Sequence, residues 1–442
     1  MNKRVLIVAS SYAPAFPADV HRARLLAWQL KSLGWAVEVL APGQAFQQPE
    51  WLNPEGRSLF APDVPCHEAQ PGLAWFYRLL GMNSLAWQAL LPLFLLGNQL
   101  LRTRQFDLIY ITTAKFNLFC LGRLWQKKCG VPYVLDFHDP WYQPGKQPVT
   151  SRHRLKFRIA AWLSRSMENF AVSRVSGLVA VSPHYLAQLR QRYSGAPAFQ
   201  KNCSAVIPFG VLPLDYSAAA SSAAAVAVAA PASAKRLIVY VGVGAEIMRK
   251  SFRRIAEGLA RLKKSHPDLV AGCRIQLCGT DGRWRAGAPK ILEVAAAASG
   301  VGEVVSEDPQ IITYQAALAM AQRADGLLVL GVEDPAYMPS KLFLYAMTGK
   351  PLLACLHADS QVNAYFKRDP EVGTLIHFDG PATAVAAEDQ LILEFLRQVA
   401  GRRTFPRENV WREFSAAAMA QKHAALFDKI IAHPRRKARM LK

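Results

Sequence analysis

The stretch that decides the fold runs from Pro339 to Ala354 and reads PSKLFLYAMTGKPLLA. A proline and a serine suited to begin a helix come first, and an apolar-faced helix follows. Gly349 ends this helix, and Lys350 and Pro351 lead into an apolar strand. Since another apolar strand precedes the stretch, the local order is strand, loop, helix, strand.

The beginning of this helix has the features of an anion site. Ser340 is the predicted N-cap, so free backbone N–H groups and the positive end of the helix dipole gather beside the ammonium of Lys341. Diphosphate is the anion that such sites usually hold. We therefore predict a diphosphate site at Ser340 and Lys341.

Length and composition indicate two cytosolic domains. The chain has 442 residues, of which 51% are hydrophobic and 10% aromatic, enough for two cores of about 200 residues each. Its seven cysteines form no CxxC or zinc spacing, which predicts reduced thiols. The apolar run after Met1 is too short for a signal peptide and indicates a first strand.

The first half of the chain alternates apolar strands with helices, which predicts a parallel sheet covered on both faces. The predicted strands are Arg4–Ala9, Ala36–Leu40, Phe106–Thr112, Pro132–Phe137, Gly177–Val181 and Ser204–Pro208. The predicted helices are Val20–Leu33 and residues 114–128, 153–173 and 183–193.

The second half repeats the pattern after an Ala/Ser-rich stretch at 217–234, which we interpret as a linker, with an Ala-rich helix as the alternative. Its predicted strands are Leu237–Val243, Arg274–Cys278, Gly326–Leu330, Leu352–Cys355 and Thr374–Phe378. The predicted helices are Phe252–Lys264 and a long terminal one from about Trp411 to Ala432.

This layout resembles the GT-B glycosyltransferases over essentially the whole chain. In their nucleotide-binding domain, a Pro-x-Lys-x-x-Glu-Tyr…Gly-Lys-Pro segment holds the donor sugar nucleotide. The resemblance implies an α/β fold of two Rossmann-like βα domains facing a cleft, with a C-terminal helix crossing back to the first domain. The expected parts are an acceptor-binding domain (1–216), the linker (217–234), a nucleotide-sugar-binding domain (235–405), and the terminal helix and basic tail (406–442).

A glycine-rich turn supplies a second candidate for phosphate binding. The segment from Tyr240 to Gly244 ends a strand, and Arg249, Lys250 and Ser251 precede a helix. Glycines let the backbone approach a phosphate and cations supply charge, although a turn with solvated cations is the alternative. In the retaining family 4 enzymes an arginine and a lysine grip the diphosphate here. Lys250 matches that lysine, whereas Val243 replaces the arginine, which Arg249 would compensate.

The leading stretch departs from the family 4 pattern in its carboxylates. Ala336 and Leu344 stand where two glutamates are usual, so Glu333 and Asp334, just upstream, are the carboxylates expected to face the sugar or ribose. The run from Met338 to Lys341 resembles instead the membrane-associated polysaccharide glucuronosyltransferases, which use a lysine here, and this leaves the stereochemistry open. The donor-binding residues so implied are Gly242, Gly244, Arg249, Lys250, Tyr314, Glu333, Met338, Ser340, Lys341 and Tyr345.

Two carboxylates and a histidine follow the strand at Pro132–Phe137, at the edge where ligands of open α/β sheets bind. The segment resembles the Asp-x-Arg/His-Asp-Pro-Trp run of these glycosyltransferases. It implies Asp139 as general base or electrostatic partner and His138 as a contact of the transferring sugar, with Asp136 bracing the loop. The alternative is a capped turn with a packing histidine.

The loop after the first strand is the candidate acceptor site. The family usually has glycines here, but this chain has Ala18 and Asp19. We expect Tyr12, His21 and Arg22 to meet an anionic acceptor such as a lipid diphosphate, with a helix-capping loop as the alternative.

Metal and cofactor signals are weak. No Asp-x-Asp pair stands out, and Asp136, His138 and Asp139 lie too close in sequence to close a tetrahedral site. We expect a metal-independent enzyme without cofactor, with a nucleotide sugar as substrate, a UDP-sugar ahead of a GDP-sugar.

The net charge of +21 indicates an anionic partner. No nucleic-acid-binding motif accompanies it, so an anionic membrane surface is favoured. The apolar segment Leu85–Leu101 contains Pro92 and is shorter than the roughly 20 residues of a transmembrane helix, which leaves an interfacial helix or a buried one. The basic run at 433–439 adds to the membrane side.

Together these features predict a cytoplasmic glycosyltransferase, peripheral on the inner face of the membrane. It would move a hexosyl or glycuronosyl group from a nucleotide sugar to a lipid-linked or other membrane acceptor in surface polysaccharide biosynthesis. The alternatives are an inactive GT-B sugar-nucleotide-binding protein, because several family residues are missing, and a GT-B sugar-nucleotide epimerase.

Overall fold

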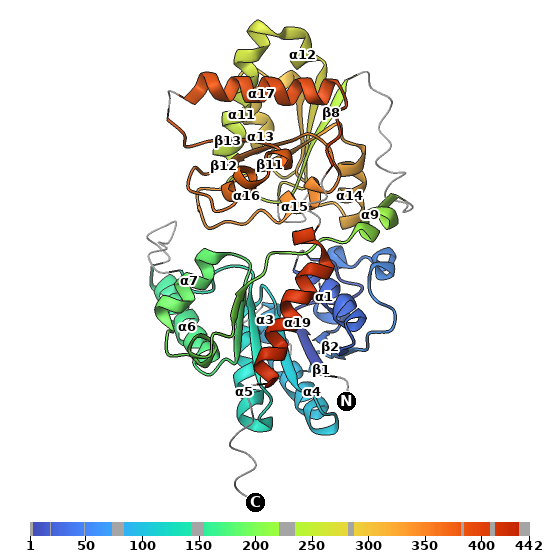
Figure 1. The fold of residues 1–442 in the computed structure, drawn as a ribbon, viewed down its shortest axis with the longest axis vertical. Helices are drawn as coiled ribbons and strands as arrows, with labels where there is room; N and C mark the ends of the chain where they lie inside the picture. The colour runs from blue at the N-terminus through green and yellow to red at the C-terminus, as the bar shows by residue number, and fades with distance from the viewer. Residues whose placement is uncertain are drawn as a thin grey trace, which may run out of the picture. The chain divides into compact units, whose positions relative to one another are not determined.

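The structure is a computed structural model, and it describes residues 3–17, 19–47, 49–72, 84–143, 154–220, 235–281, 287–381, 384–406 and 412–432. The chain forms two compact units (Figure 1). The first comprises residues 1–210 together with 416–442, and the second comprises residues 211–415.

The first unit is built on a seven-stranded parallel sheet of order β3-β2-β1-β4-β5-β6-β7. Its strands are β1 (Arg4–Ala9), β2 (Ala36–Pro42), β3 (Cys66–Ala69), β4 (Leu108–Thr112), β5 (Tyr133–Phe137), β6 (Gly177–Ala180) and β7 (Ser204–Val206). Its helices are α1 (Val20–Ser32), α3 (Leu85–Gln88), α4 (Leu90–Thr103), α5 (Cys120–Cys129), α6 (Arg154–Val172), α7 (Pro183–Arg192), α8 (Pro197–Gln200) and α19 (Ala416–Ala432).

The central strands of this parallel sheet are buried. Every residue of β4 and β5 is buried, as expected for strands that helices cover on both faces. The terminal helix α19 packs on α1, so the chain crosses back to the first unit as predicted (Figure 1). Helices α4, α5 and α6 pack in a row, α5 between the other two.

The second unit is built on a six-stranded parallel sheet of order β10-β9-β8-β11-β12-β13. Its strands are β8 (Arg236–Val241), β9 (Cys273–Cys278), β10 (Val305–Asp308), β11 (Gly326–Leu330), β12 (Leu352–Leu356) and β13 (Thr374–His377). Its helices are α9 (Pro213–Ala220), α11 (Arg249–Ser265), α12 (Pro267–Ala271), α13 (Ile291–Ala298), α14 (Tyr314–Arg323), α15 (Lys341–Ala346), α16 (Asn363–Arg368) and α17 (Val385–Ala400). Its core packs α11 and α17 against the sheet.

The unit boundaries differ from the predicted ones. The first unit ends at Gly210 rather than at 216, because α9 packs on α14 of the second unit. Residues 217–220 of the predicted linker are the end of α9, and 221–234 lie outside the described residues. The return to the first unit begins at Ala416 rather than at 406.

The segment Leu85–Leu101 forms α3 and most of α4. One side of α4, including Leu93 and Leu100, is buried in the first unit, whereas Leu91 and Leu95 are exposed. Within the described ranges, no helix has the length and apolarity that crossing a membrane requires. The first unit thus buries one part of the segment Leu85–Leu101 and leaves another part exposed to solvent.

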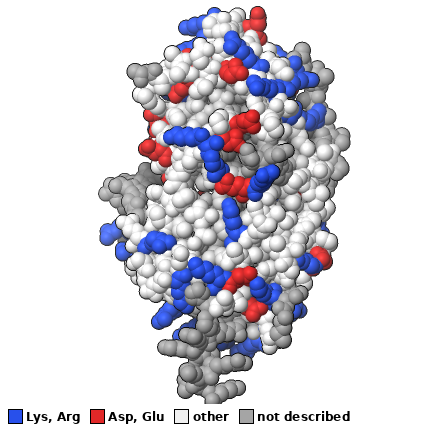
Figure 2. All heavy atoms as spheres, viewed as in Figure 1, with Lys and Arg blue, Asp and Glu red and all other residues white. Residues whose placement is uncertain are grey.

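The excess positive charge does not gather in one place on the face that Figure 2 shows. Lys and Arg side chains are spread over that face, and Asp and Glu side chains lie beside many of them. All seven cysteines are free, as predicted.

Candidate functional site

In the first unit, the carboxyl ends of β1, β4 and β5 bring the predicted catalytic and acceptor residues to one edge of the sheet. These three strands are neighbours, and the chain order of the sheet reverses between β1 and β4. Ligands of open α/β sheets bind at such a reversal, outside the carboxyl ends of the strands. The loops that begin at Ser10, Thr113 and His138 leave the sheet there.

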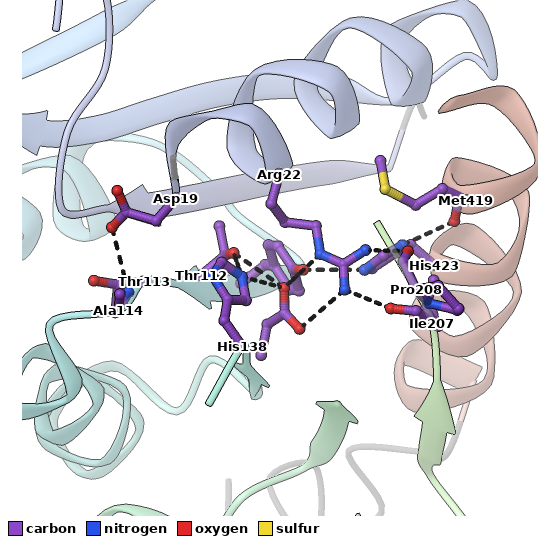
Figure 3. A network of polar contacts seen from close by, with 12 residues as sticks. Asp19, Arg22, Thr112, Thr113, Ala114, His138, Ile207, Pro208, Met419 and His423 are labelled. Atoms are coloured by element: carbon purple, nitrogen blue, oxygen red, sulfur yellow. Dashed lines mark hydrogen bonds and ion pairs between the residues drawn. The ribbon is translucent and has the colours of Figure 1, made fainter. Parts of the chain in front are cut away.

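Asp136, on β5, is the centre of a buried polar network (Figure 3). Its Oδ2 atom accepts hydrogen bonds from Arg22 Nε at 2.9 Å, from the Tyr110 hydroxyl at 2.6 Å and from Thr112 Oγ1 at 3.0 Å. Burial alone would raise the pKa of Asp136, but the Arg22 guanidinium and His138 hold it well below its usual value. Asp136 is therefore an ionised hub beneath the site rather than a loop brace.

Arg22 does not fit its predicted role as an acceptor contact. It is fully buried, and besides Asp136 it donates to the carbonyl oxygens of Pro208 at 2.7 Å and Ile207 at 2.5 Å (Figure 3). A buried guanidinium is stable only when its donors are satisfied, and here they tie α1 to β5 and to the chain after β7. Arg22 therefore holds the site together from below.

The same network fixes the ring of His138. Its Nε2 atom lies 3.1 Å from Asp136 Oδ2 and 2.9 Å from Thr112 Oγ1. Since an ionised carboxylate only accepts, Nε2 carries a proton. A sugar hydroxyl bound by His138 would therefore meet the other ring nitrogen, Nδ1. Asp139, the next residue, is exposed.

Two members of this edge were not predicted. His423 of α19 lies with Nε2 3.0 Å from the Tyr110 hydroxyl, so the terminal helix reaches the network around Asp136. Asp19 accepts hydrogen bonds from the Ser10 hydroxyl and, at 3.3 Å, from the Ala114 amide, which ties the loops after β1 and β4 together.

The other predicted acceptor residues lie at the start of the first unit. Tyr12 is buried, and its hydroxyl has no hydrogen-bond partner in the described part of the chain. His21 is partly buried, and burial, followed by the nearby Arg24 cation, lowers its pKa well below the usual value. His21 is therefore neutral and can meet an acceptor only through hydrogen bonds.

In the second unit, the equivalent reversal lies between β8 and β11 and carries the glycine turn. Gly242 and Gly244 have φ of +151° and +133°, a region that favours glycine. The Tyr345 hydroxyl accepts a hydrogen bond from the Val241 amide at 2.9 Å, so α15 is anchored to the end of β8. The turn and α15 are therefore held together at the edge where a ligand is expected.

Lys341 lies directly against this turn. A Cβ placed on Gly242 would come within 2.1 Å of Lys341 Nζ, so a side chain at this position would displace the ammonium. No carboxylate pairs with Lys341 among the residues that the structure describes. Burial lowers its pKa to about 8. An uncompensated cation beside a glycine turn is a site that an anion would complete.

Ser340 does not cap a helix, contrary to the prediction. Its backbone has φ −55° and ψ −27°, which is helical, and its side chain makes no capping hydrogen bond. The helix is also short, six residues from Lys341 to Ala346. An N-cap residue needs an extended backbone to direct its hydroxyl toward the helix amides. The attraction for an anion at this position therefore comes from the charge of Lys341 and not from a capped helix end.

Several predicted donor residues are engaged with protein partners. Lys250 forms an exposed ion pair with Glu333, and Arg249 pairs with Glu246 at 3.2 Å. The Tyr314 hydroxyl donates to Asp215 at 3.0 Å. Met338 is buried, and Ser340 is exposed. A donor diphosphate would therefore have to separate Lys250 from Glu333 to use its charge.

The described ranges contain no cluster of three or more His, Cys, Asp or Glu side chains that could hold a metal ion. Metal independence stays a prediction, as does the absence of a cofactor.

The first unit matches a known family of domains. Residues 20–200 fit the glycosyl transferase 4-like domain, a span that includes α1, β5 and the network around Asp136. No curated protein matches the chain in sequence.

Solved structures show the same two-unit fold at low identity. HepE from Anabaena, solved with UDP-glucose, has a TM-score of 0.59 and 15% identity, with 96% of this chain and 99% of HepE covered. WaaG, a glycosyltransferase involved in lipopolysaccharide biosynthesis, has a TM-score of 0.56 and 15% identity over 96% and 99% of the two chains. A proposed UDP-N-acetylglucosamine 2-epimerase from Listeria monocytogenes has a TM-score of 0.52 and 9% identity over 99% and 98%. The chain therefore has the GT-B fold, and its residues 20–200 are similar to the glycosyl transferase 4-like domain.

Proposed function

We propose that this protein is a glycosyltransferase that moves a sugar from a nucleotide-sugar donor, a UDP-sugar ahead of a GDP-sugar, to a lipid-linked or other membrane-associated acceptor in surface polysaccharide biosynthesis. The Lys341 ammonium against Gly242 carries the proposal. It is a partly buried cation for which the described part of the chain offers no counter-ion, at the sheet edge where nucleotides bind in α/β folds.

The division of labour follows the two units. The second unit would bind the donor diphosphate through Lys341 and the Gly242–Gly244 turn, with Arg249 and Lys250 joining after their ion pairs open. The first unit would offer His138 Nδ1 to a hydroxyl of the transferring sugar and Asp139 as base or electrostatic partner. The solved complexes of HepE with UDP and UDP-glucose support a UDP-sugar as the first donor to test.

A membrane-bound acceptor fits the exposed apolar surface of the first unit. Leu91 and Leu95 of α4 are exposed, the latter by 59%, and both lie in the segment for which an interfacial role is predicted. The protein would then work as a peripheral enzyme on the cytoplasmic membrane face.

The experiment is a thermal-shift series with UDP, GDP and their sugars on wild type and Lys341→Ala. We expect UDP to raise the melting temperature of wild type and not of the variant. A folded wild-type protein that no nucleotide stabilises would contradict the donor site. Turnover with membrane lipid extract, on wild type and Asp139→Asn, then tests transfer itself.

An inactive sugar-nucleotide-binding protein is the second candidate. Ala336 and Leu344 replace the two family glutamates, and Lys250 pairs with Glu333, so the carboxylates around the donor site are few. Binding of a nucleotide sugar without turnover on any lipid or saccharide acceptor would favour this candidate. Interconversion of UDP-sugars without an acceptor would favour an epimerase.

A further inference from the structure

Helix α6 exposes large apolar side chains on its outer side. Trp162 is 68% exposed, Ile159 56% and Phe170 41%. At 100° per residue, their spacing places all three on one side of the helix. Side chains of this size are exposed at a cost in water, so a stripe of them marks a contact surface.

Cations accompany this stripe, without carboxylates to neutralise them. Arg158 and Arg165 are exposed on the same side of α6 as Trp162. The neighbouring helix α5 adds Arg123 and Lys127. The Arg123 guanidinium lies 5.9 Å from the ring of Phe170, which joins the two helices into one surface. None of these four cations forms an ion pair within the described ranges.

The sequence explains why the surface stays positive. From Pro140 to Met167 there is no Asp or Glu, and Glu168 is the acidic residue of α6. The Glu168 side chain is fully buried and pairs with Arg192 at 2.9 Å, so its negative charge is neutralised inside the unit and does not reach the surface of α6. In the second unit, by contrast, Lys250, Arg249 and Arg253 each have a carboxylate partner.

We propose that the α5–α6 face, defined by Lys127, Arg158, Ile159, Trp162 and Arg165, docks on an anionic phospholipid bilayer. An exposed indole lies favourably at the depth of lipid headgroups, with its ring among the acyl chains and its N–H in water. Arg and Lys beside it gain from the negative surface potential of anionic lipids. The amphipathic helix therefore lies in the plane of the interface.

Other partners fit this combination less well. A nucleic acid would use the cations but leave the aliphatic side chain of Ile159 in water. A protein partner would have to match Arg158 and Arg165 with carboxylates placed beside an apolar surface for Trp162, which requires a specific complementary surface. A bilayer satisfies both kinds of side chain at once.

The proposed docking surface depends on the proposed function only in that both name a membrane as the partner. It places the main membrane contact on α6 and not on α4. The test is co-sedimentation of the full-length protein with two kinds of vesicle: phosphatidylcholine alone, and phosphatidylcholine with phosphatidylglycerol in equal parts. We expect wild type to bind the anionic vesicles, to release them at high salt and to leave the neutral ones unbound.

The variants locate the contact. Trp162→Ser is expected to weaken binding to anionic vesicles by about tenfold. The double variant Arg158→Ser/Arg165→Ser is expected to weaken it similarly and to reduce its salt dependence. The matched control is Val294→Ser, because Val294 of the second unit is 67% exposed and should not affect binding. Leu95→Ser should have a smaller effect than Trp162→Ser.

Three results would overturn the proposal: no binding of wild type to anionic vesicles, equal binding to neutral ones, or no effect of Trp162→Ser. Strong loss with Leu95→Ser and none with Trp162→Ser would place the contact on α4 instead. A UDP thermal shift on every variant keeps the two proposals apart. Vesicle binding without a UDP shift would overturn the donor site alone, and the reverse would overturn this surface alone.

Discussion

At the residue scale, Lys341 shows how a binding group can lower stability. Lys341 is partly buried, its ammonium lies against Gly242 with no carboxylate partner among the described residues, and its pKa of about 8 reflects the cost of removing that charge from water. The residue is thus unfavourable for folding and favourable for an anionic ligand. A structural lysine would show the opposite balance.

Lys341→Met should therefore raise the stability of the ligand-free protein by about 1 to 3 kcal/mol while removing the response to UDP. Chemical denaturation with and without UDP measures both effects. Lys250→Met is the control, because Lys250 is 65% exposed and its removal should change unfolding by less than about 1 kcal/mol. Loss of stability in Lys341→Met would contradict the anion site.

The pH dependence of donor binding follows from the same group. The folded pKa of Lys341, about 8, is below its ordinary value of 10.5, so the ammonium is largely present below about pH 7, half lost near pH 8 and largely lost above about pH 9. UDP affinity should hold up to about pH 7 and then fall, by up to about tenfold per unit above about pH 8. Isothermal titration calorimetry at a series of pH values measures this affinity. The Lys341→Met variant is the control, because any pH dependence that it retains comes from protonation of UDP itself. An affinity in wild type that is flat above pH 8 would count against Lys341 as the diphosphate ligand.

Arg22 and Asp136 form the opposite case, a buried cation with a carboxylate partner. Arg22→Ala should destabilise the protein by about 3 to 5 kcal/mol, because it leaves the Asp136 carboxylate buried without the guanidinium that balances its charge. Lys3→Ala breaks the pair with Asp428, in which both partners are nearly half exposed, and should cost less than about 1 kcal/mol. Denaturant unfolding compares the two, and a similar small loss for both would show that Arg22 is not needed to compensate Asp136.

At the element scale, the turn after β8 is shaped by what α15 places against it. Gly242→Ala would put a methyl group within 2.1 Å of Lys341 Nζ at a φ of +151°. We expect UDP affinity to fall by about tenfold, with a loss of stability of about 1 kcal/mol from the backbone. Gly34→Ala is the matched control, since Gly34 has φ +83° and no atom within 4 Å of the added Cβ. It should lose stability alone, and unchanged UDP affinity in Gly242→Ala would separate the turn from the donor site.

The same scale explains which strands the sequence could predict. β4 and β5 are buried along their whole length and read as apolar runs, so they are recognisable without any tertiary information. β3 and β10, which the sequence did not predict, are edge strands that read CHEA and VSED. Charged residues suit an edge, and they remove the apolar pattern by which a strand is recognised.

The candidate site divides in the same way. The end of β5 predicted where His138 lies, because ligands gather at the carboxyl edge of a parallel sheet, whereas the prediction for Lys341 rested on an N-cap that Ser340 does not form. The role of Arg22 depends on Asp136 and on the carbonyls of Ile207 and Pro208, partners far along the chain. His423, on α19, comes from still further away, and no local pattern marks it.

At the scale of the whole molecule, the terminal helix makes the first unit depend on the end of the chain. Phe427 of α19 is fully buried, and its ring centroid lies 5.3 Å from that of Tyr110 and 5.7 Å from that of Trp35. The first unit therefore completes its core only after the second unit has been synthesised. The donor residues, in contrast, all lie between 211 and 415.

This arrangement predicts that the two units respond separately to mutation and ligand. Phe427→Ala should cost about 3 to 5 kcal/mol in the first unit, and the matched Phe395→Ala, at 1% exposure, a similar amount in the second. Differential scanning calorimetry should show two unfolding transitions. Phe395→Ala should lower the transition temperature of the second unit, and UDP should raise that same temperature. Phe427→Ala should lower the transition temperature of the first unit, which UDP should leave unchanged. If Phe427→Ala lowered the UDP-responsive transition as much as Phe395→Ala does, the two units would unfold as one. Stabilisation by UDP could then no longer be assigned to the second unit alone.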